Sequence, residues 1–212
     1  MTNEHIFPDW LSEWFQTEGV TQFSFKTSLW GDRTTSRMDF QVKRFCETCN
    51  GVWMGEMETA VKPLLTTMIR NTNQRSILPT GQIHLARWGF KTMLTLMAAA
   101  PQDRIPPLDV YRGFRRWQTP PTIVWIGYAP DDLSVRFSAT TMTADDTGAE
   151  IHQALLLVGH FFIGAMYASD PSVGIQVNFN PESYVNIWPV RSPVLWPPAT
   201  HIDADRLFAQ LS

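Results

Sequence analysis

The sequence predicts an α+β fold, and three observations support this. Segments that alternate apolar and polar residues, typical of strands, occur in the first quarter of the chain. Long segments with apolar residues at helical spacing follow, up to about residue 117. The stretch 118–200 is rich in β-branched and aromatic residues between turn residues. We expect two regions, 1–75 and 76–212, the second packed on the first.

Region 1–75 is predicted to contain both helices and strands. Pro8 followed by Asp9–Phe15 indicates a short helix, because proline suits a first helical turn. The alternating segments 21–26 and 38–45 predict two strands, and segment 30–36 between them is turn-like. Apolar spacing then predicts a helix from about residue 50 to residue 70. Pro63 within it predicts a kink or a break.

Region 76–212 is predicted to be helical over 76–117, β-rich over 118–200 and helical again over 203–211. Asp203 is the expected N-cap of this last helix. The two helices of the first part are expected at 80–100 and 109–117. The strands of the second part are expected at 122–128, 134–142, 155–167 and 174–179, with extended segments at 187–190 and 195–198.

Composition narrows the classes of function. Hydrophobic residues make up 44% of the 212 residues and charged residues 17%, which is typical of a globular chain. The net charge of −3 argues mildly against nonspecific nucleic-acid binding, which normally needs positive charge. The longest apolar run, 151–167, contains His152, Gln153 and His160, so we expect buried core and no membrane span. No secretory signal is visible, and the expected compartment is the cytoplasm.

Cys46 and Cys49 are the two cysteines of the chain. A Cys-x-x-Cys turn directs two thiolates at one point, which is half of a tetrahedral zinc site. The sequence contains no second pair to complete that site. The alternative is that both thiols are buried and pack as small hydrophobes.

Two segments together resemble the HNH endonuclease motif, a treble-clef or ββα-metal finger. They are Glu4-His5-Ile6-Phe7-Pro8-Asp9-Trp10-Leu11 and Cys46-x-x-Cys49-Asn50 with Trp53, Met54 and Glu58. More narrowly, the chain is similar to a group of bacterial and phage HNH-like proteins over about its first third. Their Asn-Gly after the conserved Asn is replaced by Gly51-Val52, and their upstream Cys-x-x-Cys is absent. The resemblance therefore implies a degenerate HNH-like finger.

The resemblance also implies roles for particular residues. His5 would be the general base and Asn50 would orient it, while Glu4 and Glu58 would bind a catalytic divalent ion such as Mg²⁺. Cys46 and Cys49 would be a residual zinc knuckle. Such a site suits phosphodiester hydrolysis, because the metal polarises the phosphoryl oxygen and a near-neutral histidine deprotonates water. Each residue also has a structural explanation: His5 packing, Asn50 capping the helix and Glu58 facing solvent.

Four basic residues are candidates for nucleic-acid contact: Lys43, Arg44, Arg115 and Arg116. Aromatic residues near them in the sequence could stack on bases. The alternative is a solvated helix face.

Two principal hypotheses follow. The first is an HNH-like, divalent-metal-dependent DNA endonuclease. The second is a non-catalytic interaction protein on a degenerate finger, such as an accessory or anti-defence factor of a phage or mobile element, with a protein partner. A third is a subunit of a larger assembly. Whether the protein is an enzyme is left open by the sequence.

Overall fold

The computed structural model of the chain describes residues 2–20, 23–25, 33–36, 38, 40–45, 49–70, 73–99, 105–120, 123–130, 135–170, 172–175, 177, 180–190 and 192–209. Helices and strands both contribute strongly, which confirms the α+β class.

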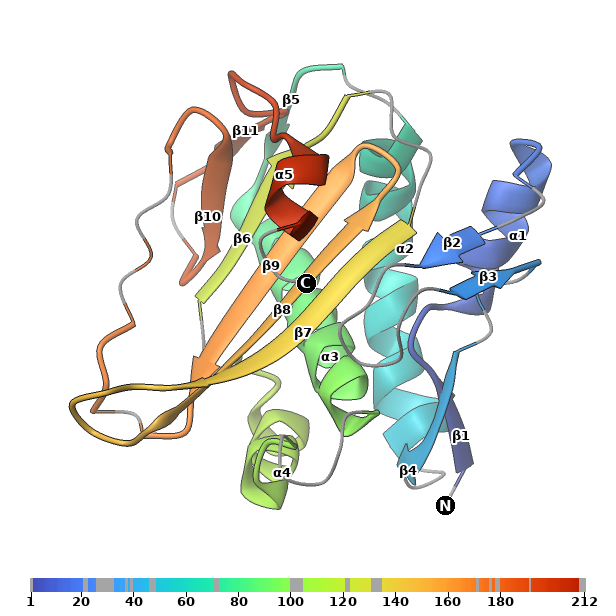
Figure 1. Ribbon diagram of the computed structural model, residues 1–212. Helices are drawn as coiled ribbons and strands as arrows, with labels where there is room; N and C mark the ends of the chain where they lie inside the picture. Colours follow the sequence, from blue (N-terminus) through green and yellow to red (C-terminus); the bar gives the residue numbers. More distant parts are fainter. Residues whose placement is uncertain are drawn as a thin grey trace.

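A five-stranded antiparallel sheet forms the centre of the fold (Figure 1). Its order is β10 (Tyr184–Trp188), β6 (Ile123–Tyr128), β9 (Phe161–Ala168), β8 (Glu150–Val158) and β7 (Val135–Thr143). The apolar run predicted as one strand at 155–167 is therefore two strands, joined at Gly159 and His160. Gly159 has a positive φ of 55°, which reverses the chain there.

Helix α3 (Pro79–Ala98) crosses one face of this sheet, and helix α2 (Gly55–Arg70) packs beside α3 (Figure 1). Alternate strand residues such as Val124, Ile126 and Leu156 join both helices in one large core. Residues from both predicted regions, 1–75 and 76–212, belong to that core. Helix α4 (Leu108–Trp117) lies at the lower end of the molecule in Figure 1.

The opposite face of the sheet carries a second, smaller core. Trp125, Leu155 and Phe162 pack there with Phe208 of the C-terminal helix α5 (Ala204–Ala209). The Asp203 carboxylate accepts a hydrogen bond from the Arg206 backbone N–H at 3.0 Å, which confirms the predicted N-cap.

The N-terminal part holds a strand pair followed by a helix. Strand β1 (Thr2–His5) pairs antiparallel with β4 (Gln41–Phe45), and a π-helical turn (Cys49–Met54) leads directly into α2. Helix α1 (Asp9–Thr17) and the hairpin of β2 (Phe23–Phe25) and β3 (Arg33–Thr35) lie between β1 and β4 in sequence. The order β1–β4–α2 is thus a ββα arrangement with an insertion.

Several predictions about single elements were wrong. Part of the turn-like segment 30–36 is strand β3, because pairing with β2 orders it. Helix α2 continues through Pro63, whose side chain faces solvent, so the predicted break into two helices is wrong, while the alternative of a kink stays a prediction. The described residues of 174–179 form no strand. Strand β5 (Arg75–Ile77), which pairs with β11 (Val194–Trp196), was not predicted.

Candidate functional site

The ammonium group of Lys91 lies between the carboxylates of Glu4 and Glu58. Its Nζ is 2.6 Å from Glu4 Oε1 and 2.8 Å from Glu58 Oε1. It also donates to the backbone carbonyl of His5 at 3.3 Å. Three elements meet here: β1 supplies Glu4, α2 supplies Glu58 and α3 supplies Lys91. The two predicted metal ligands therefore come together, and a lysine is held between them.

Burial distinguishes this cluster from a surface ion pair. The side chain of Lys91 has no exposed surface, that of Glu4 is 4% exposed and that of Glu58 is 21% exposed. Lys91 is in the middle of α3, where the surrounding residues from Trp88 to Ala98 are buried. A buried ammonium needs charged partners, because an unpaired charge there would be strongly unfavourable.

The charges in this cluster oppose one another at Glu4. Burial raises the pKa of the Glu4 carboxyl, and the nearby Glu58 raises it further, while the Lys91 ammonium lowers it. The net direction is upward. With both carboxylates ionised and Lys91 protonated, the cluster carries one negative charge.

The predicted metal site can be tested against this geometry. Lys91 Nζ occupies the point that a divalent ion would share between Glu4 and Glu58. Among the described residues, no group of three or more His, Cys, Asp or Glu side chains is arranged to hold a metal. A metal bound by both carboxylates would first have to displace the ammonium.

The ring of His5 lies against different residues. Its Nε2 is 3.2 Å from Gln41 Nε2, and its Nδ1 is 3.4 Å from Asp9 Oδ1. Successive residues of a strand point to opposite faces, so the His5 ring and the Glu4 carboxylate leave β1 in different directions, although His5 is close enough to contribute to lowering the pKa of Glu4. About one third of the His5 side chain is exposed. His5 thus reaches the cluster through its backbone carbonyl.

The remaining residues of the predicted HNH-like site lie in or near the π-helical turn. Cys46 is outside the described residues. Cys49 and Asn50 belong to the turn Cys49–Met54, but their side chains are outside the described part. The predicted zinc knuckle and the orienting role of Asn50 remain predictions.

The four basic residues predicted to contact nucleic acid are all exposed, and their elements meet. Lys43 and Arg44 are on β4, and Arg115 and Arg116 are on α4. The rings of Phe45 and Tyr111 join these elements, with centroids 6.1 Å apart. Burial raises the pKa of Tyr111, and Arg44 is close enough to lower it in part. Arg44 on β4 and Arg115 on α4 therefore both lie near the Tyr111 ring, whereas the described contacts do not place Lys43 or Arg116 beside them.

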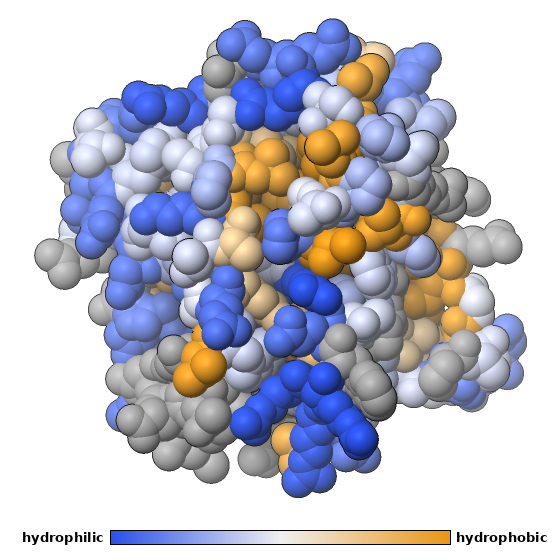
Figure 2. Space-filling view, turned by 180° about the vertical axis from the view of Figure 1, so that it is seen from behind, coloured by the Kyte–Doolittle hydropathy of each residue, from blue (hydrophilic) through white to orange (hydrophobic). Residues whose placement is uncertain are grey.

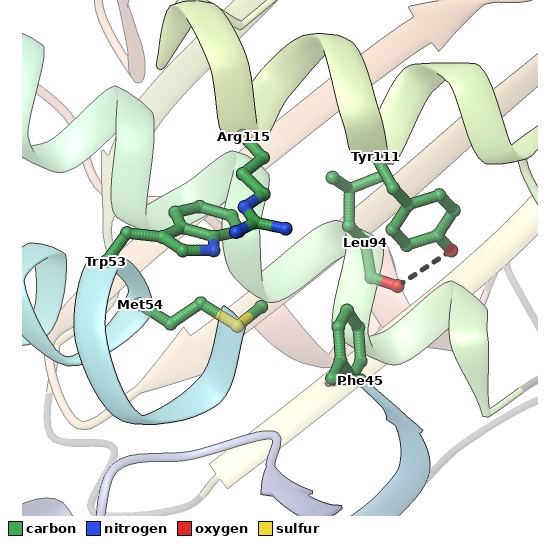
Figure 3. Close-up of a pocket in the computed structure, with 6 residues that line it drawn as sticks. All are labelled: Phe45, Trp53, Met54, Leu94, Tyr111 and Arg115. Carbon is green, nitrogen blue, oxygen red and sulfur yellow. Dashed lines mark hydrogen bonds between the residues drawn. The ribbon is translucent and has the colours of Figure 1, made fainter. Parts of the chain in front are cut away.

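A small cavity lies beside the Tyr111 ring. It has a volume of about 70 Å³, and its lining residues come from β4, the π-helical turn, α3 and α4. They are Phe45, Trp53, Met54, Leu94, Tyr111 and Arg115 (Figure 3). The Tyr111 hydroxyl donates to the Leu94 carbonyl at 3.1 Å, which fixes the tyrosine ring at the wall. The cavity is thus apolar and mainly aromatic, and Arg115 of α4 completes its wall.

Sequence reasoning missed Lys91 and this cavity. The sequence did contain an indication for Lys91, because it is the single charged residue between Trp88 and Ala98. This stretch has no polar helix face on which a solvent-exposed lysine would lie, so a buried lysine with charged partners could have been expected. The cavity had no comparable signal, since its walls come from four elements distant in the sequence.

Comparison of the sequence with protein-family models and with curated proteins, and of the structure with solved structures, finds no match. In the part of the chain that is described, no helix is long and apolar enough to cross a membrane. The geometry defines an α+β protein with a ββα arrangement and a buried Glu–Lys–Glu cluster at the junction of its strands and helices.

Proposed function

We propose that this protein is a non-catalytic interaction protein built on a degenerate HNH-like ββα finger. The observation that carries this proposal is the position of Lys91, whose ammonium bridges Glu4 and Glu58 at 2.6 and 2.8 Å. In a nuclease of this class, that point would belong to the catalytic metal. The Lys91 ammonium is instead part of the chain, so it stays between the two carboxylates and does not leave for solvent as a bound ion would.

Electrostatics supports this reading. A lysine ammonium satisfies the two carboxylates but has no vacant coordination position for a phosphoryl oxygen, which metal-assisted hydrolysis requires. Lys91 is also fully buried, so it cannot contact a substrate itself. The cluster is therefore better suited to holding β1, α2 and α3 together than to chemistry.

A second candidate is the HNH-like, divalent-metal-dependent DNA endonuclease. The observation in its favour is that Glu4 from β1 and Glu58 from α2 converge on one point, as the resemblance implies. This function requires Mg²⁺ or another divalent ion to replace Lys91 Nζ, and His5 to turn toward the metal.

Plasmid nicking separates the two candidates. Purified protein is incubated with supercoiled plasmid in Mg²⁺, Mn²⁺ or Zn²⁺, beside the variants His5→Ala and Lys91→Ala. We expect no metal-dependent nicking by the folded wild-type protein. Nicking that requires a metal and disappears in His5→Ala would refute the non-catalytic proposal and support the endonuclease.

A further inference from the structure

A second cavity lies where helices α2 and α3 meet the C-terminal end of α4. It has a volume of about 160 Å³, and its lining residues include Trp53, Glu56, Met57, His84, Arg87 and Gln118. Figure 2 views the molecule from the side of these helices, and apolar and strongly hydrophilic surface lie next to each other in the middle of that face. We call this space the polar cavity, because its wall holds both an acidic and a basic side chain.

The guanidinium group of Arg87 is held in place at the wall of the polar cavity. Its Nε donates a partly buried hydrogen bond to the backbone carbonyl of Gln118 at 2.8 Å. Gln118 is the left-handed residue that ends α4, and its own N–H donates to the Phe114 carbonyl at 2.7 Å. Among the described residues, no carboxylate pairs with Arg87. Its two terminal amino groups are therefore available to an anionic group in the cavity, and their spacing suits the two oxygens of a carboxylate.

Glu56 brings the opposite charge to the same cavity, from α2. Its side chain is exposed, and it forms no ion pair within the part of the chain that is described. Glu56 and Arg87 thus border one space without satisfying each other. A molecule that presents a cation to Glu56 and an anion to Arg87 would satisfy both side chains at once.

We propose that the polar cavity binds a small zwitterion of the α-amino-acid type, with its carboxylate on Arg87 and its ammonium on Glu56. This inference goes beyond the proposed interaction function and does not depend on it. A cavity of about 150 Å³ holds a ligand the size of benzene. The polar cavity, at about 160 Å³, therefore has room for an amino acid with a short side chain, such as valine.

The rest of the wall fits the apolar part of such a ligand. Met57 is buried, and the half-buried Trp53 ring packs edge-on against Phe114, with centroids 5.5 Å apart. This packing fixes both walls before a ligand arrives, which lowers the entropy lost on binding. His84 lies one turn before Arg87 on the same face of α3 and offers a ring nitrogen as a further polar contact.

Two simpler classes of ligand fit the polar cavity less well. A plain carboxylate would pair with Arg87 but would bring a second negative charge toward Glu56. A plain amine would pair with Glu56 but would bring a second positive charge toward Arg87. Each would leave one charged group of the wall facing a like charge or no partner, which disfavours both classes relative to a zwitterion.

The test is saturation-transfer NMR titration with three ligands that share one carbon skeleton. They are L-valine, 3-methylbutanoate, which lacks the ammonium, and 2-methylpropylamine, which lacks the carboxylate. The titrations use the wild-type protein and three variants. Glu56→Gln removes the partner of the ammonium, and Arg87→Gln removes the partner of the carboxylate. Glu13→Gln is the matched control, because Glu13 is an exposed glutamate on α1, outside the lining residues of the cavity.

We expect the wild type to bind valine at least about fivefold more tightly than either analogue, since each analogue loses one charge-assisted contact. Glu56→Gln should weaken valine binding by about fivefold and leave 3-methylbutanoate binding unchanged or tighter, so that the preference for valine disappears. Arg87→Gln should weaken the binding of both carboxylates, and Glu13→Gln should bind as the wild type does. Thermal unfolding checks that each variant is folded. Glu56→Gln, at an exposed position, decides the test if Arg87→Gln unfolds through the loss of its bond to Gln118.

Three results would overturn the proposal. The first is that the folded wild type does not bind valine at millimolar concentrations. The second is that Glu56→Gln and Glu13→Gln bind valine equally well. The third is that the wild type binds 3-methylbutanoate as tightly as valine, which would identify a site for simple anions on Arg87. None of these results bears on the non-catalytic proposal, which the nicking experiment tests by itself.

Discussion

The ammonium nitrogen of Lys91 lies 2.6 Å from a carboxylate oxygen of Glu4, and both side chains are almost completely buried. This pair connects the N-terminal strand to the middle of α3. Removing one partner of such a pair is costly, because the other charge is left buried without compensation.

Lys91→Met should therefore lower the free energy of unfolding strongly, by about 3–5 kcal/mol. Methionine keeps the volume of the side chain but leaves Glu4 and Glu58 facing each other without a cation. Urea unfolding followed by circular dichroism measures the change. The matched control is Lys62→Met, at an exposed lysine over the Trp10 ring, which should cost about 0.5 kcal/mol. Equal effects of the two substitutions would show that the cluster does not stabilise the fold.

Much of the fold could be predicted from periodicity alone. The positions of α1, α3 and α4 follow from apolar spacing, and β6 and β7 from their β-branched residues. The segment 155–167 was assigned to one strand because its buried residues form an almost continuous apolar run. A hairpin buried on both faces shows no alternation to mark its turn.

The candidate site was predicted in part. The resemblance requires His5, Glu4 and Glu58 to converge. Glu4 and Glu58 lie together, whereas the His5 ring lies against Gln41 and Asp9. What lies between the two carboxylates depends on α3, which no local pattern in region 1–75 describes. The short strands β3 and β5 were missed for a related reason. These three-residue strands are stabilised by pairing with β2 and β11. Each contains too few residues to show the alternation of apolar and polar side chains that identifies a strand in a sequence.

Removing the lysine should create affinity for a metal. In Lys91→Ala, the vacated space lies between two carboxylates, which are suitable ligands for Mn²⁺. We expect millimolar Mn²⁺ to raise the melting temperature of Lys91→Ala and not that of the wild type, because a ligand that binds the native state stabilises it. The double variant Lys91→Ala with Glu4→Gln should lose the effect. An equal Mn²⁺-dependent rise in the wild type would show that the ammonium does not block the site.

Glu4 should give stability a characteristic dependence on pH. Its pKa in the folded state is raised, mainly by burial, above the ordinary value of 4.5. Between the unfolded-state and folded-state pKa values of Glu4, the native state thus binds more protons than the unfolded state. The contribution of Glu4 to stability is therefore fully present below pH 4.5. It is lost as the pH rises through the folded-state pKa.

Comparison with Glu4→Gln isolates this contribution, since glutamine does not titrate. We expect the unfolding free energy of the wild type minus that of Glu4→Gln to decrease as the pH rises above 4.5. Urea titrations at several pH values measure this difference. An increase over the same range would mean that Lys91 lowers the pKa of Glu4 by more than burial raises it.

His152 should act in the opposite direction. Its side chain has no exposed surface, and burial lowers its pKa below the ordinary value of 6.5, although Glu150, with Oε2 3.5 Å from His152 Nε2, raises it in part. The unfolded state then binds more protons between the two values. The stabilising contribution of His152 is therefore fully present above pH 6.5, and it is lost as the pH falls through the folded-state pKa of His152. His152→Gln should remove this loss of stability at acidic pH. If stability depends on pH in the same way in this variant as in the wild type, the loss does not come from His152.

Gly164 should not tolerate a side chain, because Trp125 lies directly across the β6–β9 pair from it. A Cβ atom at Gly164 would come within 2.3 Å of the Trp125 ring, which is itself buried beneath α5. Gly164→Ala should therefore destabilise the protein by about 1–3 kcal/mol, the usual cost of overpacking a core. Gly113→Ala is the matched control: a Cβ there meets nothing within 4 Å, and alanine in helix α4 should stabilise by about 0.5–1 kcal/mol. Thermal and urea unfolding measure the change in stability of each variant. If Trp125 packs on the backbone of β9, Gly164→Ala lowers the free energy of unfolding and Gly113→Ala raises it. A Gly164→Ala variant as stable as the wild type would refute this packing.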